Sequence, residues 1–339
     1  MNIVLTIAVA IAVFMLIILI HEFGHFLVAK RCGVLVHEFS IGFGPKLLKW
    51  EKGETKYSLR LLPLGGYVKL EGEDEDSKDK RALNNKPTGN KLAVIAAGAI
   101  FNLISGFIVL TICFSFQSDF VTLKVGRILD LPGSQAKELI EVGDEIVAVD
   151  GKNVWNYKDF SFLMSNVDRT KPVDLTIKRG GAKKDFEIKP VLYEGDYLIG
   201  IEMSVEDMTF KNAIICGLKE MFFVVRVVIY SLLMLVTGKV PVSQMSGPVG
   251  TTVLIGQAAQ TGIINLLYMF ALLSVNIGIF NLLPFPALDG GRIFFLLIEF
   301  IRRKPIPAEK EGKIHFIGLV LLLLLMVFVT SSDIYKLFR

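Results

Sequence analysis

A nearly unbroken apolar stretch sets the class of this protein: it has the sequence VLTIAVAIAVFMLIILIHEFGHFL and covers residues 4–27. It is long enough for one helix to cross the hydrocarbon core of a bilayer, which takes about 20 apolar residues. No Lys or Arg precedes it, and it is longer than the apolar core of a secretory signal. We therefore interpret it as a retained membrane helix that carries two histidines and a glutamate near its end.

Three further stretches have the same character, and the composition of the chain agrees with them. Hydrophobic residues make up 52% of the 339 residues, charged residues make up 21%, and the mean hydropathy is +0.54. A soluble domain usually carries about 25% charged residues, so a purely water-soluble protein is excluded. The predicted spans are residues 4–27, 92–116, 263–288 and 314–330. The expected fold class is a membrane α-helical protein with four transmembrane helices.

A fifth apolar stretch, residues 212–236, carries three charged residues: Lys219, Glu220 and Arg226. Each charge at the centre of a spanning helix costs about 2.5–3.5 kcal/mol on insertion scales. We therefore expect an amphipathic helix on the membrane surface, where these charges would stay in contact with water.

Between the second and third spans, residues 122–206 alternate between short polar and apolar runs that end in turn signals such as Pro132-Gly133. This spacing is typical of a small β-rich domain with one or two short helices. A similar pattern at residues 40–70, with a turn at Pro63–Tyr67, predicts a β-hairpin that lies beside the membrane.

The chain is thus expected to have three parts. Residues 1–121 hold the first span, the hairpin and the second span, residues 122–206 form the β-rich domain, and residues 207–339 hold the amphipathic helix and the last two spans. Lys and Arg crowd the connections that follow the first and third spans. The positive-inside rule places those connections in the cytoplasm and the β-rich domain outside a multi-pass protein of the cytoplasmic membrane.

Two function classes are disfavoured by charge and cysteine content. The net charge of +4 is small, and no stripe of basic and aromatic residues is present, so the sequence gives no reason to expect a nucleic-acid partner. The three cysteines are far apart in the chain and offer neither a disulfide framework nor a thiolate metal cluster.

The motif His21-Glu22-Phe23-Gly24-His25 carries the chemistry. Positions i and i+4 lie on one face of a helix, so both imidazoles can bind the same Zn²⁺. The carboxylate of Glu22 can take a proton from water that attacks a carbonyl at the metal. Two histidines and a glutamate in an apolar helix are costly unless they bind or react, so we favour this interpretation over chance.

A hydrolytic zinc site usually takes three protein ligands. The other two histidines, His37 and His315, belong to no partner motif, whereas Asp289 stands in the apolar stretch of residues 281–291. In isolation this aspartate would be a helix cap before a Gly-Gly break. Beside a two-histidine site that lacks a ligand, it becomes the predicted third ligand. Both sets of ligands lie about 20–25 residues into their spans, so they reach the same depth only if residues 212–236 do not cross the bilayer.

These residues resemble the site-2 protease family, and within it the RseP-type bacterial intramembrane zinc metalloproteases. The resemblance extends over nearly the whole chain. It is carried by four segments: His21–His25, Ser40–Pro45, Pro63–Lys69 and Asn281–Asp289.

The resemblance implies that Zn²⁺ is held by His21, His25 and Asp289, with Glu22 as the catalytic base. It implies that the region Gly65–Leu70 corresponds to the family's membrane-associated β-loop, which adds an edge to an unwound substrate, since a helical peptide bond is shielded by its own hydrogen bonds. Gly98 and Asn102 match the family's Gly-x-x-x-Asn pattern, although hydrogen bonding between helices explains Asn102 equally well. The residues expected to contact substrate are Asn281, Pro284, Asn102 and Gly66.

The external domain resembles a PDZ domain in the segment Gly143–Lys152. The segment Tyr197–Ile201 resembles the loop and strand with which such domains receive a peptide C-terminus, although an ordinary closing strand would have the same pattern. We hypothesise that this domain acts by size exclusion and admits only substrates already trimmed outside.

The leading interpretation is therefore an intramembrane zinc endopeptidase that cleaves single-span membrane proteins, such as anti-sigma factors or remnant signal peptides, near the cytoplasmic face. A metal transporter would need polar positions along several helices, and only one cluster is present. A non-catalytic PDZ scaffold would not need an intact metal motif.

Overall fold

The computed structural model describes residues 2–73, 75, 77–168, 170–241, 246–304 and 306–337. The chain folds into two compact units. The helical unit comprises residues 1–109 and 227–339, and the β-rich unit comprises residues 110–226.

Four helices are long and apolar enough to cross a membrane, within the described ranges. They are α1 (Ile3–Arg31), α2 (Thr88–Ser115), α7 (Ile263–Leu282) and α9 (Ala308–Leu337). The four predicted spans are thus confirmed, with one correction. The third helix ends at Leu282 and not at Leu288. Two prolines, Pro284 and Pro286, follow it, and a proline disfavours helical geometry at the residue before it.

Glycines let the spanning helices pack closely. A Cβ atom on Gly24 of α1 would lie 2.6 Å from the carbonyl oxygen of Ala97 on α2. A Cβ atom on Gly278 of α7 would lie 2.9 Å from the carbonyl oxygen of Ala99. Small residues at such crossings let backbones approach each other, which is how membrane helices associate. The helices α1, α2 and α7 therefore form one packed group.

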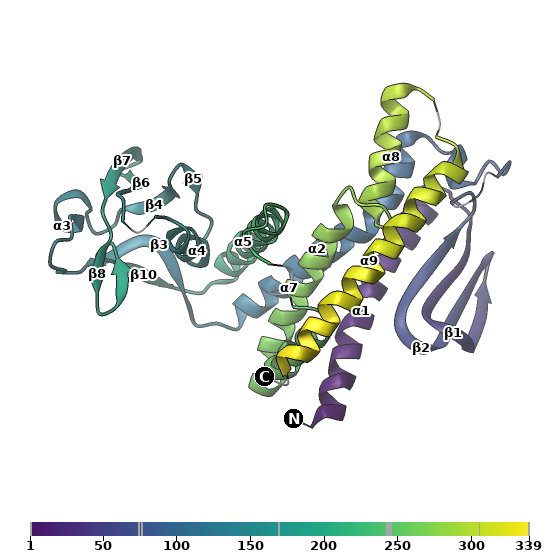
Figure 1. Ribbon diagram of the computed structural model, residues 1–339, viewed down its shortest axis with the longest axis horizontal. Helices are drawn as coiled ribbons and strands as arrows, with labels where there is room; N and C mark the ends of the chain where they lie inside the picture. Colours follow the sequence, from purple (N-terminus) through teal and green to yellow (C-terminus); the bar gives the residue numbers. More distant parts are fainter. Residues whose placement is uncertain are drawn as a thin grey trace. The chain divides into compact units, whose positions relative to one another are not determined.

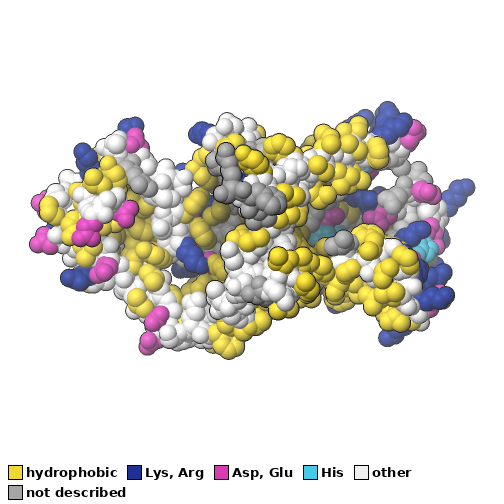
Figure 2. Space-filling model, turned by 60° about the horizontal axis from the view of Figure 1, so that its bottom comes forward, with side chains coloured by type: hydrophobic (Ala, Val, Ile, Leu, Met, Phe, Trp, Pro, Cys, Tyr) yellow, Lys and Arg dark blue, Asp and Glu magenta, His cyan; other side chains and the backbone are white. Residues whose placement is uncertain are grey.

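The outer faces of the helical unit are mostly apolar. Figure 2 shows hydrophobic side chains along its helices and Lys and Arg side chains gathered at the end that carries the hairpin and α8 (Asp289–Arg302). Large apolar side chains of α9 such as Leu324 and Phe328 are more than half exposed. A surface of this kind is suited to lipid.

The opposite end of the helical unit is formed by α6 (Pro248–Thr261) and the two ends of the chain (Figure 1). The backbone N–H of Gly250 donates a hydrogen bond to Asp333 on α9 at 2.8 Å. A Cβ atom on Gly256 would lie 2.5 Å from Thr6 on α1. The start of α1, helix α6 and the end of α9 therefore lie at the same end.

The predicted hairpin is present as β1 (Val36–Lys52) and β2 (Thr55–Leu70), with its tight turn at Gly53. Residues 38–41 pair on two sides, with residues 56–59 and with residues 66–69. The strand β2 must therefore bend between these two segments, where the sequence predicted a turn at Pro63–Tyr67.

The hairpin is held against α1 and α2 by buried side chains. Val36 and Leu70 pack in one cluster with Ala29 of α1 and Val94 of α2. A short 3₁₀ helix, Leu83–Asn85, then leads into α2.

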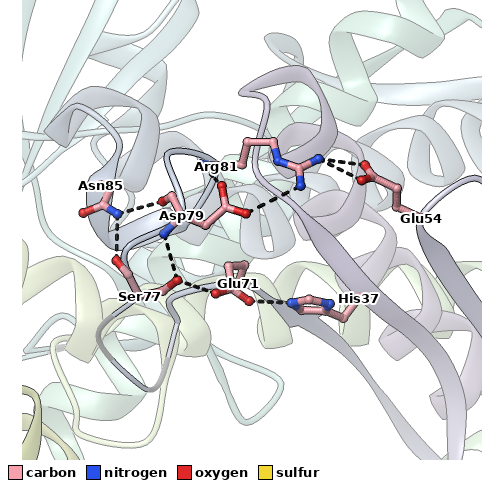
Figure 3. Close-up of polar contacts among 7 residues, drawn as sticks. All are labelled: His37, Glu54, Glu71, Ser77, Asp79, Arg81 and Asn85. Atoms are coloured by element: carbon pink, nitrogen blue, oxygen red, sulfur yellow. Dashed lines mark hydrogen bonds and ion pairs between the residues drawn. The ribbon is translucent and has the colours of Figure 1, made fainter.

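The segment between the hairpin and α2 is fixed by a network of polar side chains (Figure 3). His37 contacts Glu71 at 2.5 Å, and Arg81 donates two hydrogen bonds to Glu54, each of 2.9 Å. Asn85 donates to the carbonyl oxygens of Ser77 and Asp79, each at 2.8 Å.

The β-rich unit is built around a sheet in the order β10-β3-β4-β6-β7, with β5 paired to β4. All neighbouring strands are antiparallel. The strands are β3 (Asp119–Ile128), β4 (Glu145–Val149), β5 (Lys152–Asn153), β6 (Val173–Arg179), β7 (Ala182–Ile188) and β10 (Ile201–Asp207). A small second sheet pairs β8 (Val191–Tyr193) with β9 (Asp196–Leu198), and the short helices are α3 (Ala136–Leu139) and α4 (Tyr157–Ser165). The predicted β-rich character with short helices is confirmed.

The helix α5 (Phe210–Val236) corresponds to the fifth apolar stretch and is not among the four candidate spans found in the described residues. Its charges were expected to face water, and this expectation is wrong for Glu220, which is 1% exposed. Glu220 accepts hydrogen bonds from Lys158 at 2.7 Å and Asn156 at 2.8 Å. Arg226 likewise contacts the buried Asp159 at 2.5 Å. These charges tie α5 to α4 because buried charges need partners.

Candidate metal centre

The two motif histidines face each other on α1. Their spacing of four residues places both rings on one side of the helix, with ring centroids 4.8 Å apart and the two Nε2 atoms 3.2 Å apart. Their side chains are only 12% and 14% exposed. The sequence motif therefore produces a converging pair of nitrogen donors inside the helical unit.

Asp289 joins this pair from a distant part of the chain. It is the first residue of α8, and its Oδ2 atom lies 3.2 Å from Nε2 of His21 and 3.3 Å from Nε2 of His25. The turn before it is tight, since a Cβ atom on Gly290 or Gly291 would collide with backbone atoms of the preceding loop. One ligand atom from each of these three residues lies within 4.8 Å of the others.

Hydrogen bonds from α2 orient the two rings. Nδ1 of His25 donates to the carbonyl oxygen of Val94 at 2.8 Å, so its Nε2 is left unprotonated and faces the other two donors. Asn102 is fully buried, and its side-chain amide lies 3.4 Å from Nδ1 of His21, where the amide oxygen can accept the Nδ1 proton and leave Nε2 of His21 unprotonated. Such partners fix the ring orientation of metal-binding histidines.

A glycine on α2 provides the space that the rings occupy. A Cβ atom on Gly98 would collide with Nε2 of His25 and would lie 2.7 Å from Nε2 of His21. Any side chain at this position would therefore displace both imidazoles.

Glu22 lies between the histidine pair and the hairpin. A Cβ atom on Gly66 of β2 would lie 3.5 Å from Cγ of Glu22. Gly66 itself belongs to the segment of β2 that pairs with β1 on one side, and no strand pairs with its other side among the residues described. The glutamate is thus next to a strand with a free edge.

The other residues expected to contact substrate are placed as follows. Asn281 lies in the last turn of α7 and Pro284 in the loop after it, both within nine residues of Asp289 along the chain. Within the described part of the chain, neither side chain makes a hydrogen bond to a histidine of the motif. Asn102 is buried behind His21, a position that favours an orienting role over substrate contact.

The chain is similar to known proteins over most of its length. Residues 9–325 match the family model described as peptidase family M50. A Clostridium perfringens protein is 42% identical over 96% of this chain and 97% of its own length.

The chain belongs to peptidase family M50. Two further relatives have names that state an activity. The zinc metalloprotease RasP of Geobacillus kaustophilus is 31% identical over 97% of both chains. The regulator of sigma-W protease RasP of Bacillus subtilis is 31% identical over 98% of this chain and 99% of its own length. This M50 peptidase is a zinc metalloprotease, as the sequence predicted.

The residues of the cluster fit a zinc ion. Two imidazole nitrogens and one carboxylate oxygen make a donor set common in catalytic zinc sites, which keep a further position open. Oδ2 of Asp289 is buried and has no hydrogen-bond partner among the residues that the structure describes, as expected of an atom that binds a cation.

Two supporting features could not be found from the sequence. The carbonyl of Val94 is a backbone group, and every residue type has one, so the sequence does not reveal its role. The function of Gly98 as open space depends on how α2 crosses α1, and the motif pattern that includes it was the only available signal.

Proposed function

We propose that this M50 peptidase is an intramembrane endopeptidase in which His21, His25 and Asp289 hold the zinc ion and Glu22 is the catalytic base. One observation carries the proposal: a helix long enough to span a membrane and a loop more than 250 residues later bring three donors together at one buried point. Soluble hydrolases need no such site within an apolar helix, so the substrate bond is expected to lie within the bilayer.

Zinc, when bound, acts as a Lewis acid that polarises the peptide carbonyl and makes water a stronger nucleophile. Glu22 takes the proton from the attacking water and then donates it to the leaving amine. Val94 and Asn102 keep the two imidazoles oriented during this cycle.

The free edge of β2 gives an unwound substrate a place to bind. A transmembrane helix hides its peptide bonds in internal hydrogen bonds, so cleavage requires local unwinding, and an edge strand can accept the exposed backbone groups. Gly66 lies at this edge beside Glu22, and a Cβ atom there would lie 2.8 Å from the carbonyl oxygen of Ser40 on β1, so a side chain would disturb this strand pair. Asn281 at the end of α7 and Pro284 in the loop before Asp289 are proposed to contact the same extended segment.

The β-rich unit is proposed to be an extracytoplasmic PDZ domain that admits substrates only after trimming. Its strand β10 is at the edge of the sheet, and a cavity of about 250 Å³ next to it is lined by Phe160 and Met164 of α4 and by Tyr197 and Ile199. An edge strand beside an apolar cavity is suited to a peptide C-terminus. The Bacillus subtilis relative is named for sigma-W regulation, which supports single-span regulators as substrates, with remnant signal peptides as a second class.

The test uses a single-span reporter protein in membranes of the native host, with its outer domain either intact or trimmed. The wild-type chain should cleave only the trimmed form. Glu22→Gln should lower cleavage by about 10²–10⁴-fold while zinc is still bound, since only the base is lost. Deletion of residues 122–206 should allow cleavage of both forms.

The outcomes separate the parts of the proposal. Unchanged cleavage by Glu22→Gln would refute the base and with it the protease mechanism. Unchanged exclusion of the intact reporter by the deletion variant would refute only the filter. Membrane proteins that accumulate in the Glu22→Gln strain identify the natural substrates.

A further inference from the structure

His315 is a buried histidine that the metal centre does not use. It lies in α9, outside the motif, and its side chain is 17% exposed. It contacts the loop of residues 283–288, which connects α7 to Asp289. A polar side chain at such a place in an apolar helix calls for a physical reason.

The first contact is a hydrogen bond to the backbone of the loop. The N–H of Ala287 donates to Nδ1 of His315 at 2.9 Å. Ala287 has a φ of +77°, a conformation that a residue with a side chain rarely adopts and that persists only where its surroundings hold it. Ala287 is two residues from Asp289. The hydrogen bond from Ala287 to His315 therefore holds a strained backbone position that helps to set the direction of the Asp289 side chain.

The second contact is one turn further along α9. A Cβ atom on Gly318 would lie 2.5 Å from Cβ of Pro286 and would also collide with the carbonyl oxygen of Pro286. The helix and the loop are therefore in direct backbone contact. The ring of His315 also packs on Phe295 of α8, with centroids 5.6 Å apart. The loop is thus held by α9 at two successive residues, Pro286 and Ala287.

We infer that His315 is a positioning residue, whose Nδ1 atom holds the loop of residues 283–288 so that Asp289 meets the two histidines. The inference rests on the proposed role of Asp289 as a zinc ligand. Nδ1 is the atom that binds the loop, because the N–H of Ala287 needs an acceptor. The ring must therefore be the tautomer that carries its proton on Nε2. Nε2 itself is buried and has no hydrogen-bond partner among the described residues, and Glu311 lies 3.6 Å from it.

Two substitutions separate Nδ1 from the bulk of the ring. The side-chain oxygen of Asn can take the place of Nδ1, whereas that of Gln can take the place of Nε2. We expect His315→Gln to weaken zinc binding about 10-fold or more, the size of effect seen when a group that orients a ligand is lost. His315→Asn should stay within about 3-fold of wild type. A residue that only fills space would rank the two variants in the opposite order, because Gln is the larger side chain.

The experiment measures zinc affinity of the purified full-length chain by competition with a chelator, and amide hydrogen exchange of the zinc-free chain. In the zinc-free chain, the peptide that contains Ala287 should exchange faster in His315→Gln than in wild type and His315→Asn. His37→Gln, a substitution of the other histidine outside the motif, is the matched control and should change neither quantity. If His315→Gln does not fold, Gly318→Ala disturbs the neighbouring contact of α9 with the same loop, at Pro286, and should also weaken zinc binding.

Asp289→Asn separates the zinc-ligand role of Asp289 from the positioning role of His315. If Asp289→Asn keeps wild-type zinc affinity, the ligand assignment fails and the proposed function with it. If Asp289→Asn loses zinc but His315→Gln binds it as wild type does, the ligand assignment stands and the role of His315 is overturned. Equal zinc affinity of the Asn and Gln variants would likewise overturn it.

Discussion

At the scale of single residues, the metal centre depends as much on an absent side chain as on those present. His21 and His25 would converge on any helix, because their spacing is fixed by helical geometry. They can occupy their positions only because Gly98 of α2 leaves room, and the backbone of Val94, one helical turn earlier, orients one ring. The helix α2 therefore supplies both the space and the hydrogen bond that this histidine pair needs.

Gly98→Ala should disrupt the centre without disturbing the helix. The added methyl group collides with both imidazoles, and a displacement of about 1 Å at a reacting group can cost about 100-fold in rate. We expect zinc affinity to fall at least about 10-fold and cleavage by about 100-fold. Zinc content and reporter cleavage measure the two effects.

Gly89→Ala is the control for that substitution. It lies in the same helix, and apart from the adjoining backbone of that helix, no atom of the described residues lies within 4 Å of the Cβ that it would add. It should leave zinc content and cleavage as in wild type. Equal loss in both variants would mean that the effect comes from the helix and not from the imidazoles.

At the scale of elements, a buried ion pair fastens the sheet of the β-rich unit. Asp144, just before β4, accepts hydrogen bonds from Arg179 at the end of β6, at 2.8 Å from Nε and 2.6 Å from Nη2. The guanidinium of Arg179 holds the pKa of Asp144 below its ordinary value, against the opposing effect of burial. The ion pair thus links β4 to β6, and folding favours the charged form of Asp144.

This pair predicts a pH dependence with a definite sign. Because the pKa of Asp144 is lowered by folding, its contribution is complete above the unfolded pKa of about 3.9 and is lost as the pH falls below it. Asp144→Asn should lower the free energy of unfolding by about 1–3 kcal/mol near neutral pH and by less in acid. Fluorescence of Trp155 in a Trp50→Phe background measures unfolding of this unit.

Glu141→Gln supplies the comparison for the ion pair. Glu141 bonds the same arginine at 2.6 Å but is 68% exposed, so its loss should cost less than about 1 kcal/mol. If wild type and Asp144→Asn lost the same stability between pH 5 and pH 3, the ion pair would not be the cause.

At the scale of the whole molecule, the four spans and α5 decide which side of the membrane each connection faces. The polar side chains of α5 are bonded within the β-rich unit, so α5 is expected to stay on the side of that unit. The start of α6 contacts the end of α9, which places both on one side. We therefore propose that the chain crosses the bilayer four times, with both ends outside.

Cysteine labelling tests this topology. In a chain whose native cysteines are replaced, single cysteines at Glu206 and Ser246 should react with an impermeant thiol reagent added to intact cells. A cysteine at Arg303 should react only after the membrane is permeabilised, because Lys and Arg favour the cytoplasmic side. Labelling of positions 206 and 246 from opposite sides would show that α5 crosses the bilayer.

The sequence by itself determined the four spans, the β-rich segment and the converging histidines, because apolar length and helical periodicity are local properties. It also indicated Asp289 by elimination. Only the tertiary structure brought Asp289 to the two imidazoles and showed that Glu220 is buried, that Gly98 leaves the space that the two rings occupy and that His315 bonds to the loop before Asp289. These features depend on which helix faces which, and that choice is made by packing between residues far apart in the chain.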